Sequence, residues 1–223
     1  MNTNGIENGL GRLQQLSLMR SQVASPSGKN AEVEEVIDSA AIEPKAKPFY
    51  EYQEEPWLTD PGFEQVSNRY CYVYYKEISV RLELGLAKLD NDRFMKELAD
   101  THPKIASKNF GYTLGRGADI KIIDYDSSLT DNDKQVVVDL MNRRDGFKAA
   151  LQSVARGMMT LVDHDRDCEV FGSRYKLDID NFQFVIDFQK IFNVPLEKVG
   201  EEWILQIQRN AERRDSSDIL VEA

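Results

Sequence analysis

An abrupt change in composition near residue 60 divides the 223-residue chain into two parts that cannot fold alike. Residues 1–60 are rich in Asn, Gly, Ser, Pro, Ala and Glu, with proline-containing stretches at 25–30 and 43–48. Such a segment buries too little apolar surface to offset a backbone-ordering cost of roughly 1–2 kcal/mol per residue. We therefore predict an extended, disordered-type N-terminal arm over 1–60, a globular domain over 61–214 and an acidic, then apolar, C-terminal tail over 215–223.

Short apolar groups in the arm and the tail are predicted to bind protein partners. Leucines that recur every three positions would form an apolar stripe on a short helix, which is marginal in isolation. The aromatic and acidic segment 49–58 is either a strap packed on its own domain or a docking segment for another chain, because exposed aromatic side chains anchor interfaces. The predicted protein-binding residues are Leu10, Leu13, Leu16, Met19, Phe49, Tyr50, Tyr52, Trp57, Ile219 and Leu220.

Helical periodicity dominates the chain after residue 61. Apolar spacing predicts one long helix from Phe63 to Leu89, although residues 78–86 also alternate between apolar and polar side chains as in a strand. The uninterrupted length of the segment favours the helix. The sequence Asp90-Asn91-Asp92 is expected to end it and to cap a short helix that contains Phe94, Met95 and Leu98.

Turn residues predict two small hairpins. Segments 109–114 and 118–122 alternate in polarity on either side of a Gly115-Arg116-Gly117 turn, which makes them the best hairpin candidate. A second small hairpin is expected over Glu169–Tyr175.

Capping signals and periodicity predict the remaining helices. Thr130 and Asp133 resemble a capping box that opens a helix ending at Asp145-Gly146. The cleanest amphipathic pattern follows over Phe147–Val162, with Leu151, Val154 and Met158 on the buried side.

Two further helices are expected near the C-terminus. Asp180 or Asn181 would cap one that runs to Phe192, and Pro195 would open the last one, which carries Trp203. The predicted fold class is α+β and predominantly helical: a single globular domain of about five helices with one or two small β-hairpins.

Charge and cysteine usage limit the class of protein. The net charge is −10, and residues 1–60, with 5 basic and 10 acidic side chains, carry −5 of it. Neither part has the basic field that phosphate binding uses, so nucleic acid is not the expected partner. Cys71 and Cys168 belong to no paired motif and are expected to be reduced. With no secretory signal and no apolar run near the ~20 residues of a membrane span, we expect a soluble, cytoplasmic protein.

Two carboxylate clusters are candidate metal sites. A calcium loop starting at Asp163 would continue through Asp165 and Asp167, but it has Cys168 where glycine is needed and Arg174 where a bidentate glutamate is needed. The second cluster contains Asp124, Asp126, Asp131 and Asp133. Its position at a helix start is explained by capping and the helix dipole. We therefore expect neither a metal nor another cofactor.

Other motifs that carry chemistry are weak. The segment Gly111–Gly117 matches neither a P-loop nor a dinucleotide fingerprint, and only two histidines are present to support a nucleophile. Helices on either side of Asn193-Val194-Pro195 look like a helix-turn-helix, but Glu197, Glu201 and Glu202 would face the phosphates.

These observations predict a non-enzymatic structural or assembly subunit of a larger complex, such as a phage or virion component, that binds neighbours or copies of itself through its arm and tail. The alternative is an accessory nucleic-acid protein that binds single strands, with stacking and phosphate contacts at Lys104, Lys108, Phe110, Tyr112 and Arg116. A weaker alternative is a metal-dependent hydrolase that uses the Asp124 or the Asp163 cluster.

Overall fold

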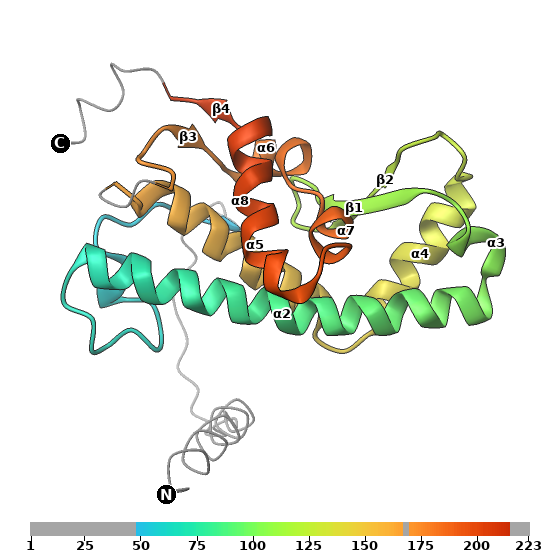
Figure 1. Ribbon diagram of the computed structural model, residues 1–223, viewed down its shortest axis with the longest axis horizontal. Helices are drawn as coiled ribbons and strands as arrows, with labels where there is room; N and C mark the ends of the chain where they lie inside the picture. Colours follow the sequence, from blue (N-terminus) through green and yellow to red (C-terminus); the bar gives the residue numbers. More distant parts are fainter. Residues whose placement is uncertain (1–47, 167–169, 215–223) are drawn as a thin grey trace, which may run out of the picture. The chain divides into compact units, whose positions relative to one another are not determined.

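The computed structural model describes residues 48–166 and 170–214, which belong to one compact unit (Figure 1). Seven α-helices and two small antiparallel sheets form this part of the chain, so the predicted α+β, predominantly helical class is confirmed. The elements in order are η2 (Pro56–Leu58), α2 (Arg69–Thr101), α3 (Pro103–Ala106), β1 (Phe110–Leu114), β2 (Ile120–Asp124), α4 (Asp131–Arg143), α5 (Phe147–His164), β3 (Tyr175–Lys176), α6 (Ile179–Val185), α7 (Phe188–Phe192), η3 (Leu196–Lys198), α8 (Val199–Asn210) and β4 (Glu212–Arg213).

Helix α2 is the longest element, with 33 residues. The Asn68 side chain caps it by accepting a hydrogen bond from the Cys71 backbone N–H at 2.9 Å. It begins six residues after the predicted start at Phe63, because turns occupy the chain before Asn68. It ends at Thr101, where Pro103 opens the short α3.

The expectation that Asp90-Asn91-Asp92 ends the helix is wrong. Asn91 is 2% exposed, and its side-chain oxygen accepts a hydrogen bond from the Tyr112 hydroxyl at 2.8 Å. Its two acidic neighbours form ion pairs along the helix with Lys88 and Arg93. Polar side chains that are paired in this way do not compete for the helix backbone, so α2 continues through them.

The predicted hairpin and the predicted capping box are both confirmed. Strands β1 and β2 pair antiparallel, with Phe110 opposite Asp124 and Leu114 opposite Ile120. All of β1 is buried. The Thr130 hydroxyl accepts from the Asp133 backbone N–H at 3.1 Å, and the Asp133 carboxylate accepts from the Thr130 N–H at 3.0 Å, which starts α4.

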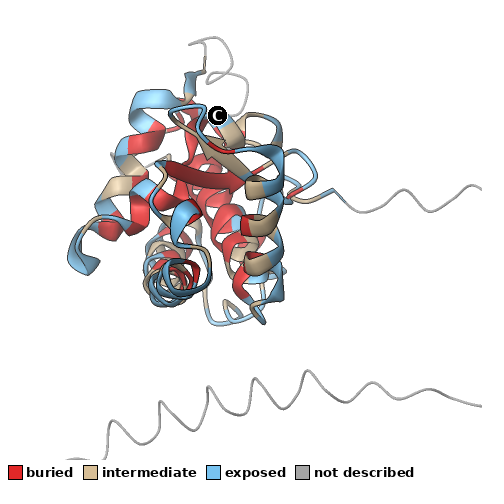
Figure 2. Ribbon diagram, turned by 90° about the vertical axis from the view of Figure 1, so that its right-hand side faces the viewer, coloured by how far each residue is buried: buried red, intermediate tan, exposed pale blue. Residues whose placement is uncertain are grey.

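Helix α5 lies in the core between α2 and the strand β3, and it is the predicted amphipathic helix extended by two residues to His164. Gly146, with φ of 81°, supplies the break before it. Leu151, Val154 and Met158 are fully buried, as predicted. Figure 2 shows that the buried residues lie mainly where the helices and strands face one another.

The second hairpin is not the local one that the sequence predicted over 169–175. Strand β3 pairs instead with β4, so that Tyr175 lies opposite Arg213 near the end of the described chain. Gly172 and Ser173, with φ of 54° and 55°, turn the chain back toward the end of α5. There the Ser173 N–H donates to the Asp165 carbonyl at 3.2 Å.

The predicted helix up to Phe192 is two helices. Asp178 rather than Asp180 caps α6, through a capping box with Asn181. Asp187 then caps α7 by accepting from the Lys190 N–H, so the helix path breaks between the two.

The last helix also begins later than predicted. Pro195 caps the 3-10 turn η3, and α8 begins only at Val199.

Gly157 sets the approach of α5 to α2. A Cβ added at Gly157 would lie 2.4 Å from Val80 Cγ2, so the two helices would have to separate. We expect Gly157→Ala to lower the free energy of unfolding by about 1–3 kcal/mol, the usual cost of overpacking. Urea titration followed by circular dichroism measures this.

Gly85 provides a matched control within α2. Its added Cβ would lie 3.7 Å from Leu196 Cδ1, an ordinary contact, so Gly85→Ala should stabilise the protein by up to about 1 kcal/mol through helix propensity. When it is combined with Gly157→Ala, the substitution Val80→Ala should restore part of the lost stability, because it removes the Cγ2 atom that the added Cβ would meet. Equal effects of the two Gly→Ala substitutions would contradict the close packing.

Candidate functional site

Helix α2 carries a second apolar face that no described residue covers. Its core face is buried through Val73, Val80, Leu84, Ala87, Phe94 and Leu98. On its other side, five large apolar side chains are 39–66% exposed. We call this set the α2 stripe: Tyr75, Ile78, Leu82, Leu86 and Leu89.

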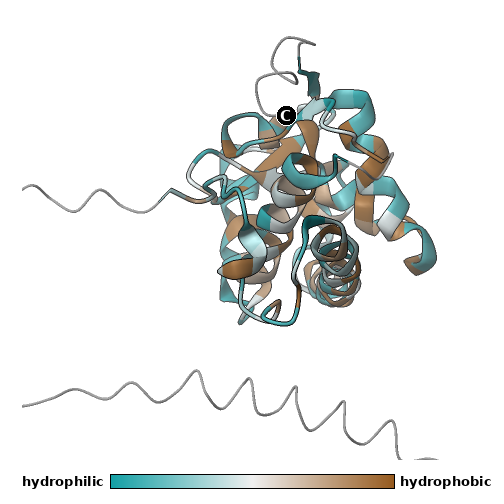
Figure 3. Cartoon of the chain, turned by 90° about the vertical axis from the view of Figure 1, so that its left-hand side faces the viewer, coloured by the Kyte–Doolittle hydropathy of each residue, from teal (hydrophilic) through white to brown (hydrophobic). Residues whose placement is uncertain are grey.

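The two faces lie on opposite sides of the helix. At about 100° per residue, the stripe falls within about 40° of Leu82, and the core face is centred about 160° away. Figures 2 and 3 view α2 nearly end-on and show other elements packed on one side of it only. The stripe from Tyr75 to Leu89 is therefore a continuous apolar ridge about 21 Å long.

Aromatic and aliphatic residues extend this ridge, and charges border it. Tyr74 is 55% exposed, and Leu196 of η3 is 56% exposed beside Gly85. Arg81 pairs with Glu77 at 2.7 Å, and Lys88 donates to the Phe192 carbonyl, so these cations are held beside the stripe rather than over it. The ridge itself stays apolar.

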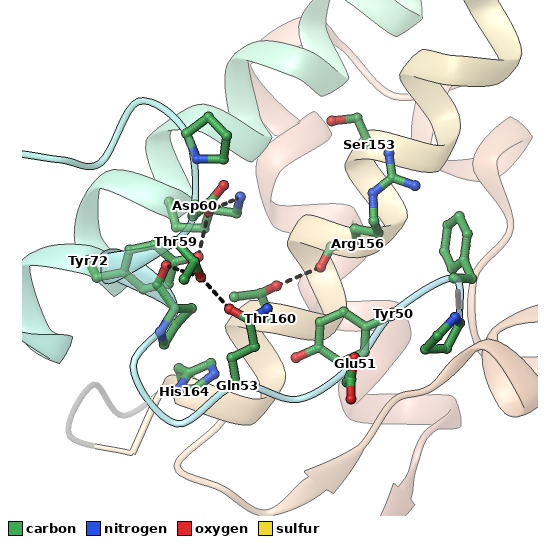
Figure 4. A pocket seen from close by; sticks show the side chains of 15 residues that line it. Tyr50, Glu51, Gln53, Thr59, Asp60, Tyr72, Ser153, Arg156, Thr160 and His164 are labelled. Atoms are coloured by element: carbon green, nitrogen blue, oxygen red, sulfur yellow. Dashed lines mark hydrogen bonds and ion pairs between the residues drawn. The ribbon is translucent and has the colours of Figure 1, made fainter. Parts of the chain in front are cut away.

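A polar pocket of about 540 Å³ lies at the N-terminal end of the described chain (Figure 4). The segment 48–61 crosses α2 and α5 there. The Tyr50 hydroxyl donates to Asp163 at 2.7 Å. Asp60 accepts from the Tyr72 hydroxyl at 2.6 Å and pairs with Lys76 at 2.8 Å. Burial next to a carboxylate raises the pKa of both tyrosine hydroxyls, which therefore remain donors.

His164 is the buried histidine that lines this pocket. It is 2% exposed, stacks on Tyr52 with ring centroids 5.1 Å apart and meets the Tyr72 ring edge-on. Its Nδ1 has no hydrogen-bond partner in the part of the chain that the structure describes. Burial, and then the nearby Arg69 and Arg166, lower its pKa to about 4, so the imidazole is neutral at pH 7.

The structure places part of the predicted protein-binding set on its own domain. Trp57 is buried, Tyr50 is bonded to Asp163, and the Phe49 ring lies under the Arg156 guanidinium at 5.0 Å. These contacts are those of the strap alternative, while Tyr52 remains 44% exposed. Partner binding by this segment stays a prediction. The other predicted residues, Leu10, Leu13, Leu16, Met19, Ile219 and Leu220, lie outside the described residues.

The five residues of the nucleic-acid alternative do not form a shared groove. Phe110 and Tyr112 are 5% and 0% exposed, so their rings are not accessible to bases. Lys108 pairs with Asp133 at 2.8 Å, and Arg116 pairs with Asp180 at 3.4 Å. Lys104, on α3, is exposed.

Three of the carboxylates considered for metal binding, Asp124, Asp133 and Asp163, have other partners. Asp124 accepts from the backbone of Ser128 and Leu129, and Asp133 caps α4. Asp163 bonds Tyr50 and Arg214. Within 48–166 and 170–214, no group of three or more His, Cys, Asp or Glu side chains has the arrangement of a metal site. Asp167 lies outside these ranges.

Comparisons of this chain with protein-family models, with curated proteins and with solved structures found no match. Among the described residues, no helix is both long enough and apolar enough to cross a membrane.

The α2 stripe was not predicted, although its signal is present in the sequence. Residues two apart on a helix differ by about 200°, so an apolar residue at every second position marks two opposite faces. Val80 and Leu84 are buried, whereas Ile78, Leu82 and Leu86 are exposed. The strand-like alternation over 78–86 is the signature of a helix with two apolar faces.

Proposed function

We propose that the protein is a non-enzymatic assembly subunit of a larger complex and that the α2 stripe is where it packs against an apolar helix of a neighbouring subunit. The observation that carries the proposal is the second apolar face of α2. Contacts through the arm (1–60) and the tail (215–223) belong to the same proposal.

The size and continuity of the stripe support an interface. Single exposed leucines are common on protein surfaces, but a contiguous apolar patch of several hundred Å² usually marks an interaction site. Five stripe residues follow one another along one side of a helix, with Tyr74 and Leu196 beside them. A straight ridge of this kind fits the groove of another helix.

The scaffold also prepares the stripe for binding. The opposite face of α2 is fixed in the core by fully buried side chains such as Leu84, Phe94 and Leu98. Binding would therefore order few main-chain groups, which lowers the entropic cost of association. One face of α2 thus stabilises the fold, while the opposite face is available to bind a neighbouring subunit.

Charge on the stripe should disrupt the complex without unfolding the subunit. In the double variant Leu82→Glu, Leu86→Glu, the yield of co-purified neighbouring subunit should fall at least roughly 10-fold, because central interface residues dominate affinity. The tagged chain is purified from its native source, and the complex mass is measured by light scattering. Thermal melts should overlay, since both side chains are more than 60% exposed in the subunit.

Phe184→Glu is the matched control, because Phe184 is a large apolar residue that is 72% exposed and lies in α6, outside the stripe, the arm and the tail. It should keep the complex intact. Equal recovery of the complex with the stripe variant and with this control would overturn the proposed function.

A further inference from the structure

We propose that the neighbour on the α2 stripe is a second copy of this chain, with the two α2 helices side by side and parallel across a two-fold axis. This inference rests on the proposed function, because it names the occupant of the same surface. A two-fold axis parallel to the helices sets each stripe residue against its own counterpart, so Leu82 meets the partner's Leu82.

Charges on the two borders of the stripe favour this self-pairing. Arg81 lies on one border and Glu83 on the other, each about 100° from the stripe centre. Lys88 and Asp90 lie on the same two borders, but they are already paired within α2 with Asp92 and Arg93. A parallel two-fold axis brings Arg81 of each copy toward Glu83 of the other. Residues in such flanking positions set partner choice and orientation in paired helices.

An antiparallel pair would not have this complementarity. Its two-fold axis brings each border against the same border of the partner, so Arg81 would approach the partner's Arg81 and Glu83 the partner's Glu83. The spacing of the stripe is symmetric about Leu82 and allows this alignment sterically. Like charges on both borders disfavour it.

The exposed apolar area matches what a dimer needs. At the exposures given above, the five stripe residues with Tyr74 and Leu196 offer roughly 500 Å² of apolar surface. A standard interface covers about 800 Å² per partner, of which a little over half is apolar, or about 450 Å². The stripe and its charged borders therefore offer enough surface for an interface with one second copy of the chain.

The oligomeric state of the full chain tests the occupant. Light scattering at micromolar concentration should give twice the 25.5 kDa chain mass for the wild type and for Phe184→Glu. The double variant Leu82→Glu, Leu86→Glu should raise the dimer dissociation constant at least roughly 100-fold. A dimer that survives this variant would use another surface and would overturn the inference.

A charge swap tests the orientation. Arg81→Glu and Glu83→Arg should each weaken the dimer, and the double swap should restore it, because Arg and Glu face each other again only in the parallel pair. Circular dichroism of each variant checks that the subunit remains folded. Failure of the double swap to restore the dimer would overturn the parallel arrangement.

Cross-linking gives an independent readout in a Cys71→Ser, Cys168→Ser background. With a short bismaleimide, the Ile78→Cys chain should cross-link to itself. A product formed only when Ile78→Cys and Leu86→Cys chains are mixed would show the antiparallel pair and overturn the inference. In the Cys168→Ser chain, Cys71 near the stripe's N-terminal end should also cross-link to the partner's Cys71.

Failure of this inference is distinguishable from failure of the proposed function. A wild type that is monomeric alone, but whose native complex is lost in the stripe variant, would show that the neighbour is a different protein. The second-copy inference would then be overturned while the proposed function stands. A stripe variant that matches the wild type in both experiments would overturn both.

Discussion

Replacing Leu151 by alanine should lower the free energy of unfolding by about 2–5 kcal/mol, the range seen when a packed leucine site is emptied. Leu151 is fully buried on α5, the helix that packs against α2 in the core. Its removal leaves a cavity that rigid neighbours fill only in part. For a domain of this size, the melting temperature should fall by about 2–4 °C per kcal/mol lost.

Two matched variants define the measurement by urea titration. Leu58→Ala removes the same atoms from a side chain that is 69% exposed and should change the stability by no more than about 0.5 kcal/mol. Leu151→Met nearly conserves volume and should cost less than about 1.5 kcal/mol. If Leu151→Ala costs no more than the Leu58 control, Leu151 does not lie in a packed core.

The features predicted correctly from the sequence are local ones. The Thr130 and Asp133 capping box needs only residues three apart, and the β1–β2 turn closes locally through the hydrogen bond from the Ala118 N–H to the Gly115 carbonyl, with Ala118 rather than a glycine at positive φ. The buried side of α5 follows from a 3.6-residue period. In each case the interacting residues are close in sequence, so the local sequence pattern is enough to predict the structure.

Features that depend on distant partners were not predictable in the same way. Strand β3 has two residues, and its partner β4 lies 37 positions further along the chain. The break between α6 and α7 is fixed by Asp187, which accepts a hydrogen bond from the Tyr125 hydroxyl and whose N–H donates to Gln206 at 2.8 Å. Neither contact can be predicted from the helix or strand propensities of nearby residues.

The candidate sites divide along the same line. The α2 stripe could have been predicted from the sequence, because alternation within a long helix implies two apolar faces. The same alternation also fits a strand, and this alternative hides the second face. The pocket could not be predicted from the sequence, since Tyr50 and Asp163, which form a hydrogen bond in it, are 113 residues apart. The ring stacking of Tyr52 on His164 likewise joins segments that only the fold brings together.

His164 should make the protein less stable in mild acid. Its pKa is lowered from the ordinary value of 6.5 to about 4 in the folded state, chiefly by burial and then by Arg69, Arg166 and Arg214. Between these two values the unfolded chain binds a proton that the folded chain does not. The folded state therefore loses stability as pH falls through this window, and it has the full contribution above pH 6.5.

The size of the effect follows from the pKa shift. One pKa unit corresponds to about 1.36 kcal/mol, so the loss between pH 7 and pH 4 is at most about 3 kcal/mol. The buried ring explains its direction, because a charged imidazole between Tyr52 and Tyr72 has no water shell and its Nδ1 has no acceptor among the described residues. Carboxylates contribute a background that the wild type and a His164 variant share.

His164→Phe separates the histidine from that background, because it keeps an aromatic ring against Tyr52 and removes the titrating group. Urea titrations at half-unit steps from pH 7.5 to pH 4 should show the wild type losing up to about 3 kcal/mol more than the variant. In the NMR spectrum, the imidazole resonances that the variant lacks should shift only below about pH 5. Parallel stability curves for the two proteins, or an imidazole that titrates near 6.5 in the folded state, would show that His164 is accessible to protons and that the strap does not seal it.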